Sequence, residues 1–349
     1  MSPRAALQVR AFPDGVVEPV AAPRPRAPRI GLALGGGSAR GWAHIGVIEA
    51  LQEAGIVPEI VAGCSIGAVV GGAYAAGKLE RLKAFALSLT KRRVMGLVDL
   101  RIAGSGLIAG ERIARRLSQE LSGRRIEALP VAFACVATEL GTGHEVWLTN
   151  GPLVESVRAS YAIPGLFPPV SLDSRLLMDG TLVNPVPVRL ARELGADVVI
   201  CVNLGCDPRV RGSVIRPEAP PDDDDDVLEA ELERVVETRS RWALLRGAGL
   251  RIVGRGAPRL RPAAKATGEK SAAPGAARVM FDAFNITQDR ISRARLAVDP
   301  PDVTVSPRLA AMGLFEFHRA AEGIALGREA GRAALPEIRR MIEGAAARV

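Results

Sequence analysis

The most constraining feature of this chain is a glycine-rich turn that joins an apolar run to a run of small residues. The residues PEIVAG end at Gly63, and the chain then passes through Ser65 and Gly67 into the stretch IGAVVGGAYAAG. The first run is typical of a short buried strand, and the second is typical of a helix packed closely against a sheet. We therefore expect an α/β fold in which Ser65 stands on a tight strand-to-helix turn, the setting of a nucleophilic serine.

A second strand–glycine–helix unit precedes the first. The run RIGLALGGG alternates apolar residues and ends in Gly35, Gly36 and Gly37, and a helix pattern with C-terminal Gly55 follows. The spacing excludes a dinucleotide loop of the G-x-G-x-x-G type, because Arg40 stands where the last glycine would be. Backbone N–H groups of successive glycines suit a developing oxyanion. Phosphate binding at the helix N-terminus is the alternative.

Composition limits the class of protein. The chain has 349 residues, 48% hydrophobic and 24% charged, which allows a large packed core. No apolar run approaches the roughly 18 residues of a membrane span, and residues 1–28 have no secretory signal pattern. The net charge is +8, but aromatic residues make up only 4%, which argues against a nucleic-acid partner. The four cysteines lack metal-ligand spacing and are expected to be reduced thiols of a cytoplasmic protein.

The chain offers few candidates for a general base. Of its three histidines, His44, His144 and His318, only His318 follows the serine in the order that α/β-hydrolases use, and a helix pattern surrounds it. Asp179 ends the strand-like run RLLMD and precedes Gly180. This carboxylate could meet a serine from a neighbouring strand, or it could simply cap an Asp-Gly turn. Both interpretations stay open at this point.

Three motifs in this order, GGGSARG (35–41), GCSIG (63–67) and DGT (179–181), together with SYAIPGLFPPV (160–170), resemble the patatin-like phospholipase family. The resemblance implies a three-layer α/β/α sandwich with a mostly parallel central sheet. It implies a Ser-Asp dyad of Ser65 and Asp179, with Gly36 and Gly37 as oxyanion donors and no metal or cofactor. Thr181 departs from the Gly or Ala that is usual in the family. The other motif residues are Gly35, Arg40, Gly41, Gly63, Gly67 and Gly180.

The resemblance also implies a reaction and a substrate class. We expect a serine acyl hydrolase of phospholipase A or lysophospholipase type that acts on fatty acyl esters of lipids. The alternatives are an acyltransferase that uses the same acyl-enzyme, a histidine-dependent α/β-hydrolase, and a non-catalytic lipid-binding regulatory protein. The expected location is the cytoplasm, with peripheral attachment to the inner membrane face as an option.

The chain divides into three expected parts: a disordered tail (1–28), a catalytic domain (29–210) and a mainly helical extension (211–349). The extension contains a mobile insert (247–277) rich in arginine, glycine and proline. Two interpretations of this insert stay open, a solvated linker and a weak contact with an anionic membrane surface. The run Asp222–Asp226 is expected to be a solvated helix start rather than a metal site.

Overall fold

Five parallel strands form the centre of the computed structural model, which describes residues 26–99, 107–121, 123–205 and 276–348. Their order across the sheet is β3-β2-β1-β7-β8. β8 comes from the C-terminal part of the chain, so that part completes the sheet that the N-terminal part begins. The bounds are β1 Ile30–Leu34, β2 Ile60–Cys64, β3 Ala132–Glu139, β7 Val198–Val202 and β8 Val303–Val305.

Antiparallel strands extend the sheet at β3. β4 (Glu145–Leu148) and β6 (Arg175–Asp179) both pair with β3, and β5 (Val170–Leu172) pairs with β6. Ala137 of β3 pairs with β4 and with β6, so these two strands lie along opposite edges of β3. Val136 pairs with β4 and with β2, so β2 and β6 share the other edge.

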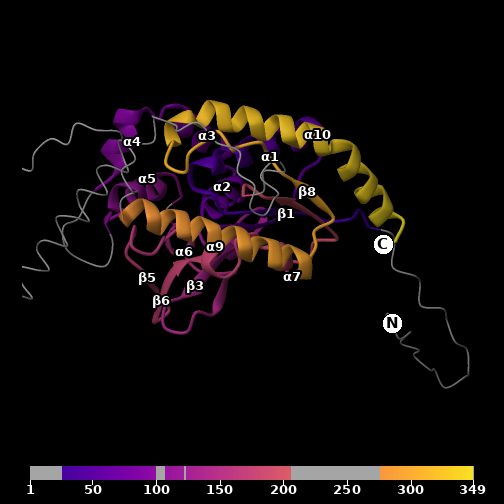
Figure 1. Ribbon diagram of the computed structural model, residues 1–349. Helices are drawn as coiled ribbons and strands as arrows, with labels where there is room; N and C mark the ends of the chain where they lie inside the picture. Colours follow the sequence, from indigo (N-terminus) through magenta and orange to yellow (C-terminus); the bar gives the residue numbers. More distant parts are fainter. Residues whose placement is uncertain (1–25, 100–106, 122, 206–275, 349) are drawn as a thin grey trace, which may run out of the picture.

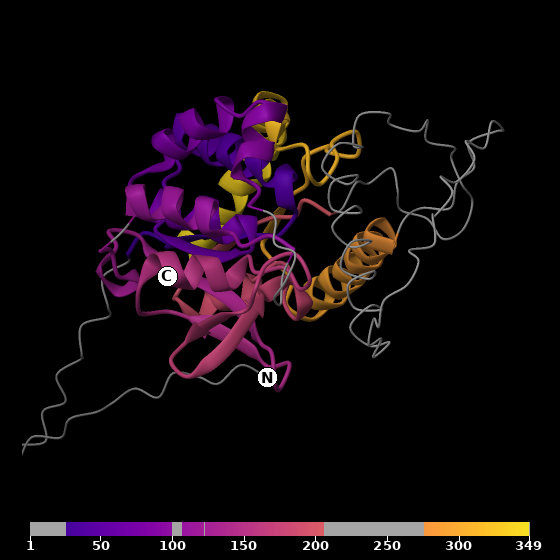
Figure 2. The same ribbon diagram turned by 90° about the vertical axis from the view of Figure 1, so that its left-hand side faces the viewer.

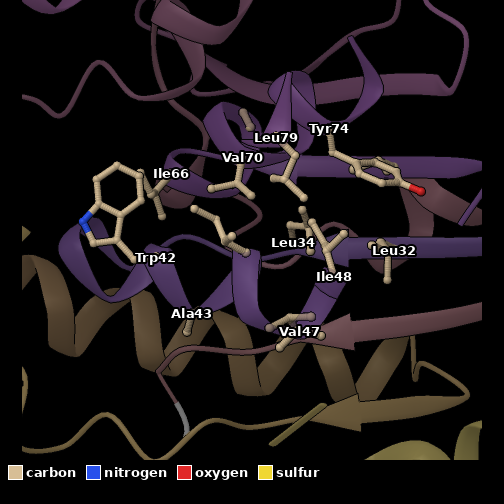
Figure 3. Packing of buried hydrophobic residues seen from close by; sticks show 14 of the residues in the cluster. Leu32, Leu34, Trp42, Ala43, Val47, Ile48, Ile66, Val70, Tyr74 and Leu79 are labelled. Carbon is tan, nitrogen blue, oxygen red and sulfur yellow. The ribbon is translucent and has the colours of Figure 1, made fainter. Parts of the chain in front are cut away.

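Side chains alternate between the two faces of the sheet, as the period of a strand requires. Leu32 and Leu34 of β1 point into one buried cluster, and Ala33 between them points into another. The first cluster is the larger, and Figure 3 shows Leu32 and Leu34 beside helix residues Ile48 and Val70. The second face is lined by smaller side chains, among them Ala33, Ala62, Ala134, Cys64 and Cys201.

Helices cover both faces, which gives the expected three-layer sandwich with a mostly parallel sheet. α1, α2 and α10 pack on the first face, and α7 packs on the second with Leu296 of α9. The two views show α10 and α9 on different sides of the sheet (Figure 1, Figure 2). The bounds are α1 Ala43–Glu53, α2 Ile66–Ala75, α3 Leu79–Leu87, α4 Lys91–Leu97, α5 Glu111–Leu121, α6 Leu153–Ser160, α7 Val188–Glu193, α9 Ala276–Val298 and α10 Ala320–Ala346.

The contact between α1 and α10 depends on glycine. A Cβ atom on Gly327 of α10 would lie 2.0 Å from the carbonyl oxygen of Ala43, and one on Gly46 of α1 would lie 1.9 Å from that of Ile324. The two helix backbones therefore approach more closely than any larger residue would allow. Glu49 of α1 also forms an ion pair with Arg328 of α10.

Several sequence predictions are confirmed locally. The predicted strands before Gly35 and Gly63 are β1 and β2, and the predicted helices after them are α1 and α2. Gly55 follows α1 with a positive φ of 78°, the backbone expected of a C-terminal glycine. Cys64, Cys135 and Cys201 are buried and free of disulfides.

None of the described helices is long and apolar enough to cross a bilayer.

The expected division at residue 210 separates two segments that the structure joins. β8 pairs with β7, and α10 packs on α1, so the described part of the C-terminal extension shares one core with residues 29–205. The extension is mainly helical where it is described. Residues 1–25 of the expected tail, Cys206, the run Asp222–Asp226 and residues 247–275 of the insert lie outside the described residues.

The helix contact yields a stability prediction. Gly327→Ala should lower the free energy of unfolding by about 2 kcal/mol, because the new methyl group forces the helices apart. Gly344 also lies in α10, but a Cβ there would meet nothing within 4 Å. Gly344→Ala is the matched control and should instead stabilise by up to ~1 kcal/mol through helix propensity. Urea denaturation followed by circular dichroism measures both. If both substitutions changed the free energy of unfolding equally, the close approach of α1 and α10 would not contribute to stability.

Candidate active site

The strand register brings Ser65 and Asp179 together. β2 pairs with β3 up to Cys64 opposite Val136, and β6 takes over the same edge with Asp179 opposite Ala137. Because β6 runs antiparallel to β3, its C-terminal end meets the C-terminal end of β2 head to head. The first residue after β2 is Ser65, and its hydroxyl donates a hydrogen bond of 2.8 Å to Oδ2 of Asp179.

Ser65 has a strained backbone at the turn between β2 and α2. Its φ is +54° and its ψ is −121°, a region that residues with side chains rarely adopt. The backbone N–H of Ser65 donates to Oγ of Ser160, which in turn donates to the carbonyl of Val136. Ser160 thus ties the turn to β3 and helps to hold the strained conformation.

Two glycines make room for this turn. A Cβ on Gly63 would lie 2.6 Å from the backbone of Ala68, and one on Gly67 would lie 2.1 Å from the carbonyl oxygen of Leu34. α2 therefore starts directly against the ends of β1 and β2. This close start aims the N-terminal end of the helix, with its positive dipole, at the space beside the serine.

Asp179 is fully buried and held from several sides. Its Oδ1 accepts hydrogen bonds from the backbone N–H of Thr181 at 2.8 Å and from the Thr181 hydroxyl at 2.6 Å. Its backbone carbonyl accepts from Thr138 of β3 at 2.8 Å. Gly180 is required next to it, because a Cβ there would lie 2.3 Å from the carbonyl oxygen of Val136.

Burial raises the pKa of the Asp179 carboxyl to about 6, because the charged form is disfavoured away from water. Hydrogen bonds from Thr181 and Ser65 act in the opposite direction and limit the rise. A carboxyl with this pKa is charged at neutral pH and is a stronger base than an exposed aspartate. The capping and the serine-binding interpretations of Asp179 are both fulfilled, one through each carboxylate oxygen.

The three histidines occupy three different environments. His44 is buried on α1, its Nε2 lies 2.8 Å from the carbonyl oxygen of Gly35, and burial lowers its pKa to about 4. His144 is exposed in the β3–β4 hairpin. His318 lies in a short 3-10 turn, Phe317–Arg319, before α10, rather than in the helix expected from the sequence. In the described chain, Ser65 Oγ is bonded to Asp179 and not to a histidine.

The glycine loop corrects one sequence expectation. The N–H of Gly36 donates to the carbonyl of Pro185 at 3.0 Å, so this amide is already used within the protein. Gly36 instead provides space: a Cβ there would lie 2.3 Å from Cγ2 of Thr181 and 3.6 Å from Cβ of Ser65. Gly37 and Ser38 line the hollow beside Ser65, and Ser38 has a positive φ of 52°.

The remaining loop residues hold the loop in place. Arg40 donates through Nε to the carbonyl of Met312 at 2.8 Å, which ties the loop to the C-terminal part of the chain. A Cβ on Gly41 would lie 2.1 Å from Ile66, so the loop presses against the start of α2. Gly35 donates its N–H to Val202 of β7.

An apolar cavity of about 190 Å³ opens at Ser65. It runs between α2, α3, α4 and α5, and aromatic side chains from the segment before α10 close one side. Val69 and Ala73 line it one and two turns beyond the serine on α2. Its wall also includes Leu82, Phe85, Val94, Leu97, Leu117, Leu166 and Phe315, while charged residues Lys78, Arg81, Arg116 and Glu120 lie on its edge. A narrow apolar space beside a serine suits an acyl chain.

A second, small hollow shares Ser65 with the cavity. It is lined by Gly37, Ser38 and Thr181 on one side and by Phe284, Asn285 and Gln288 of α9 on the other. The serine thus stands between an apolar space and a more polar one.

Comparison with known proteins decides the family. Residues 32–192 match the profile of the patatin-like phospholipase family. An uncharacterised NTE family protein of Mycobacterium tuberculosis is 36% identical over 340 residues, which covers 88% of this chain and 92% of the relative. The chain belongs to the patatin-like phospholipase family. Membership supports lipid hydrolase activity in general terms.

More distant relatives match about half of this patatin-like protein. Lysophospholipase nte1 of Emericella nidulans is 34% identical over 191 residues, which covers 50% of this chain and 12% of the fungal protein. Human patatin-like phospholipase domain-containing protein 6 is 34% identical over 183 residues, covering 50% of this chain and 13% of its own. Among solved structures, VipD from Legionella pneumophila matches with a TM-score of 0.41 and 13% identity, over 97% of this chain and 70% of its own.

Three residues of the patatin-like site carry no recognisable signal in the sequence. Ser160 lies within the motif SYAIPGLFPPV, and no local pattern predicts that its hydroxyl supports the turn at Ser65. Ser38 stands beside the glycines and gave no signal of its positive φ. Gln288 lies 107 residues from Thr181 along the chain, and no local pattern connects the two.

The buried carboxylate of Asp179 leads to a pH prediction. Its pKa of about 6 in the folded state lies above the ordinary value of 3.8, so its ionisation destabilises the folded protein as pH rises through this interval. Asp179→Asn removes this cost. The gain in unfolding free energy of the variant over the parent should therefore be about 1 kcal/mol larger at pH 8 than at pH 5.

Urea denaturation at the two pH values measures this difference. Asp173→Asn, at an exposed aspartate in the β5–β6 turn, is the matched control and should show no such change with pH. If the gain in unfolding free energy for Asp179→Asn were larger at pH 5 than at pH 8, the raised pKa of Asp179 would be contradicted.

Proposed function

We propose that the protein is a serine acyl hydrolase that cleaves fatty acyl esters of lipids, of phospholipase A or lysophospholipase type. The observation that carries the proposal is the 2.8 Å hydrogen bond from Ser65 to the buried Asp179 at the mouth of an apolar cavity. Ser65 is the nucleophile, Asp179 is the general base, and the cavity receives the acyl chain.

The reaction follows from these positions. Asp179 accepts the proton of the Ser65 hydroxyl as the oxygen attacks the ester carbonyl. The tetrahedral intermediate collapses, the alcohol leaves with the proton returned by Asp179, and the acyl group stays on Ser65. Water then gives a proton to the same carboxylate and attacks the acyl-enzyme. Asp179 returns this proton to Oγ of Ser65 as the intermediate collapses, which releases the fatty acid and restores the serine hydroxyl. Every proton in this cycle passes through Oδ2 of Asp179, the oxygen that faces the serine.

The oxyanion is assigned to the glycine loop. With the Gly36 amide bonded to Pro185, the donors are the N–H groups of Gly37 and Ser38, which line the hollow at Ser65. Ser38 has a left-handed backbone, so the loop is strained at the residue whose N–H is assigned to the oxyanion. Removing one such donor typically lowers kcat by 10²–10³-fold in other serine hydrolases, roughly 3–4 kcal/mol.

The dyad predicts the effect of two substitutions. Ser65→Ala and Asp179→Asn should each lower kcat for acyl esters by about a thousandfold or more, and the double variant should be scarcely slower than either. An esterase assay on the purified variants measures this. His144→Ala, at an exposed histidine, is the control and should keep the parent rate. Substantial esterase activity in Asp179→Asn would contradict the role of Asp179 as the general base.

Product analysis with added lysophospholipid separates hydrolysis from acyl transfer.

The cavity predicts chain-length selectivity. Ala73 lies eight residues beyond Ser65, about 12 Å along the axis of α2. Ala73→Phe should fill this part of the cavity and lower kcat/KM for long acyl esters at least roughly tenfold, while butanoyl esters change little. Val69→Ala, nearer the serine, should widen the cavity and leave long chains accepted. A panel of 4-nitrophenyl esters from four to sixteen carbons measures the profile. A uniform loss at all lengths would place the acyl chain elsewhere.

A further inference from the structure

The two oxygens of Asp179 have different partners. Oδ2 accepts from Ser65, whereas Oδ1 accepts twice from Thr181, through the backbone N–H and through the hydroxyl. The hydroxyl bond of 2.6 Å is the shorter of the two. An ionised carboxylate has no proton to give, so in the charged state the Thr181 hydroxyl must be the donor.

A residue from the C-terminal part of the chain completes this arrangement. Nε2 of Gln288 lies 2.9 Å from Oγ1 of Thr181. A hydroxyl has one proton, and that of Thr181 is committed to Asp179, so Gln288 has to donate through its amide NH₂. The result is a directed chain of hydrogen bonds from Gln288 to Thr181 to Asp179.

α9 is fixed in the position that this chain requires. Further along the helix, Arg295 donates to the carbonyl of Val183 at 3.1 Å and pairs with Glu145 of β4 at 2.9 Å. Asn184 donates to the same carboxylate at 2.7 Å. The helix is therefore anchored to the loop that follows Asp179 at two places, Thr181 and Val183.

We propose that Thr181 and Gln288 are positioning residues for the general base, with Gln288 directing the Thr181 hydroxyl proton onto Oδ1 so that Oδ2 stays turned toward Ser65. The inference rests on the proposed function, because both residues act through Asp179. Two donors on Oδ1 also favour the charged form of the carboxyl.

The other charged and titratable groups around Asp179 are buried or held in ion pairs. Burial and the charge of Asp179 raise the pKa of the Cys64 thiol well above its ordinary value. Glu145 is paired with Arg295, and Asp289, beside Gln288, is paired with Arg293 at 2.9 Å. On the glycine-loop side, burial lowers the pKa of His44 to about 4.

The test is the pH dependence of kcat/KM for a soluble acyl ester. Thr181→Val removes the hydroxyl but keeps the shape and the backbone donor, so the midpoint of the acid limb should move up by about one pH unit. Thr181→Ser retains the hydroxyl and should keep the parent midpoint. Gln288→Glu supplies an acceptor that competes for the Thr181 proton and should shift the limb in the same direction as Thr181→Val. Gln288→Met, which removes the donor without adding an acceptor, should shift it less.

Two results would overturn the inference: an unchanged midpoint in Thr181→Val, or an equal shift in Thr181→Ser. A purely structural role would lower the activity at all pH values and leave the midpoint in place. Labelling of the parent protein and Ser65→Ala by a fluorophosphonate separates the two proposals. If the parent protein shows neither Ser65-dependent labelling nor esterase activity, the proposed function fails. If it shows both and the limb does not move, only the role of Thr181 and Gln288 fails.

Discussion

The site depends on one contact, the hydrogen bond between Ser65 and Asp179 at the point where two strands meet end to end. β2 and β6 occupy the same edge of β3 and run in opposite directions, so their C-terminal ends converge. Two residues that are 114 positions apart in the chain are thereby joined by a hydrogen bond of 2.8 Å. The register of β3 sets this distance, because a shift by one residue would turn Asp179 to the other face of the sheet.

Holding this contact in place carries a cost in stability. Ser65 keeps a left-handed backbone, and Asp179 keeps a buried carboxyl whose pKa is raised to about 6. Each feature is unfavourable by itself and persists because neighbours compensate for it. Ser160 binds the backbone of the turn, and Thr181 binds the carboxylate oxygen that does not face the serine. Glycines at 63, 67 and 180 allow the surrounding backbone to come close enough for these bonds.

Four features of the C-terminal part of the chain support the sheet and the site. β8 completes the sheet beside β7, and α10 covers α1, whose first residues follow the glycine loop. Met312 accepts the hydrogen bond that holds Arg40, and Gln288 of α9 reaches Thr181. The family profile ends at residue 192, so these contacts lie beyond the region that defines the family. In this chain the region that the family profile covers is held together in part by residues that lie beyond its C-terminal end.

The sequence by itself determined the local units: β1 and β2 with their glycine turns, the helices after them, and the position of Ser65 on a tight turn. These features follow from periodicity and from the space that glycine leaves, which are properties of neighbouring residues. Only the tertiary structure decided which groups meet. The amide of Gly36, expected to bind the oxyanion, is bonded to Pro185, and the carboxylate of Asp179 both caps its turn and binds the serine. Ser160 and Gln288 contribute through contacts between distant segments. A hydrogen bond depends on positions in space within a few tenths of an ångström, and the order of residues along the chain does not contain those positions until the sheet register and the helix packing are set.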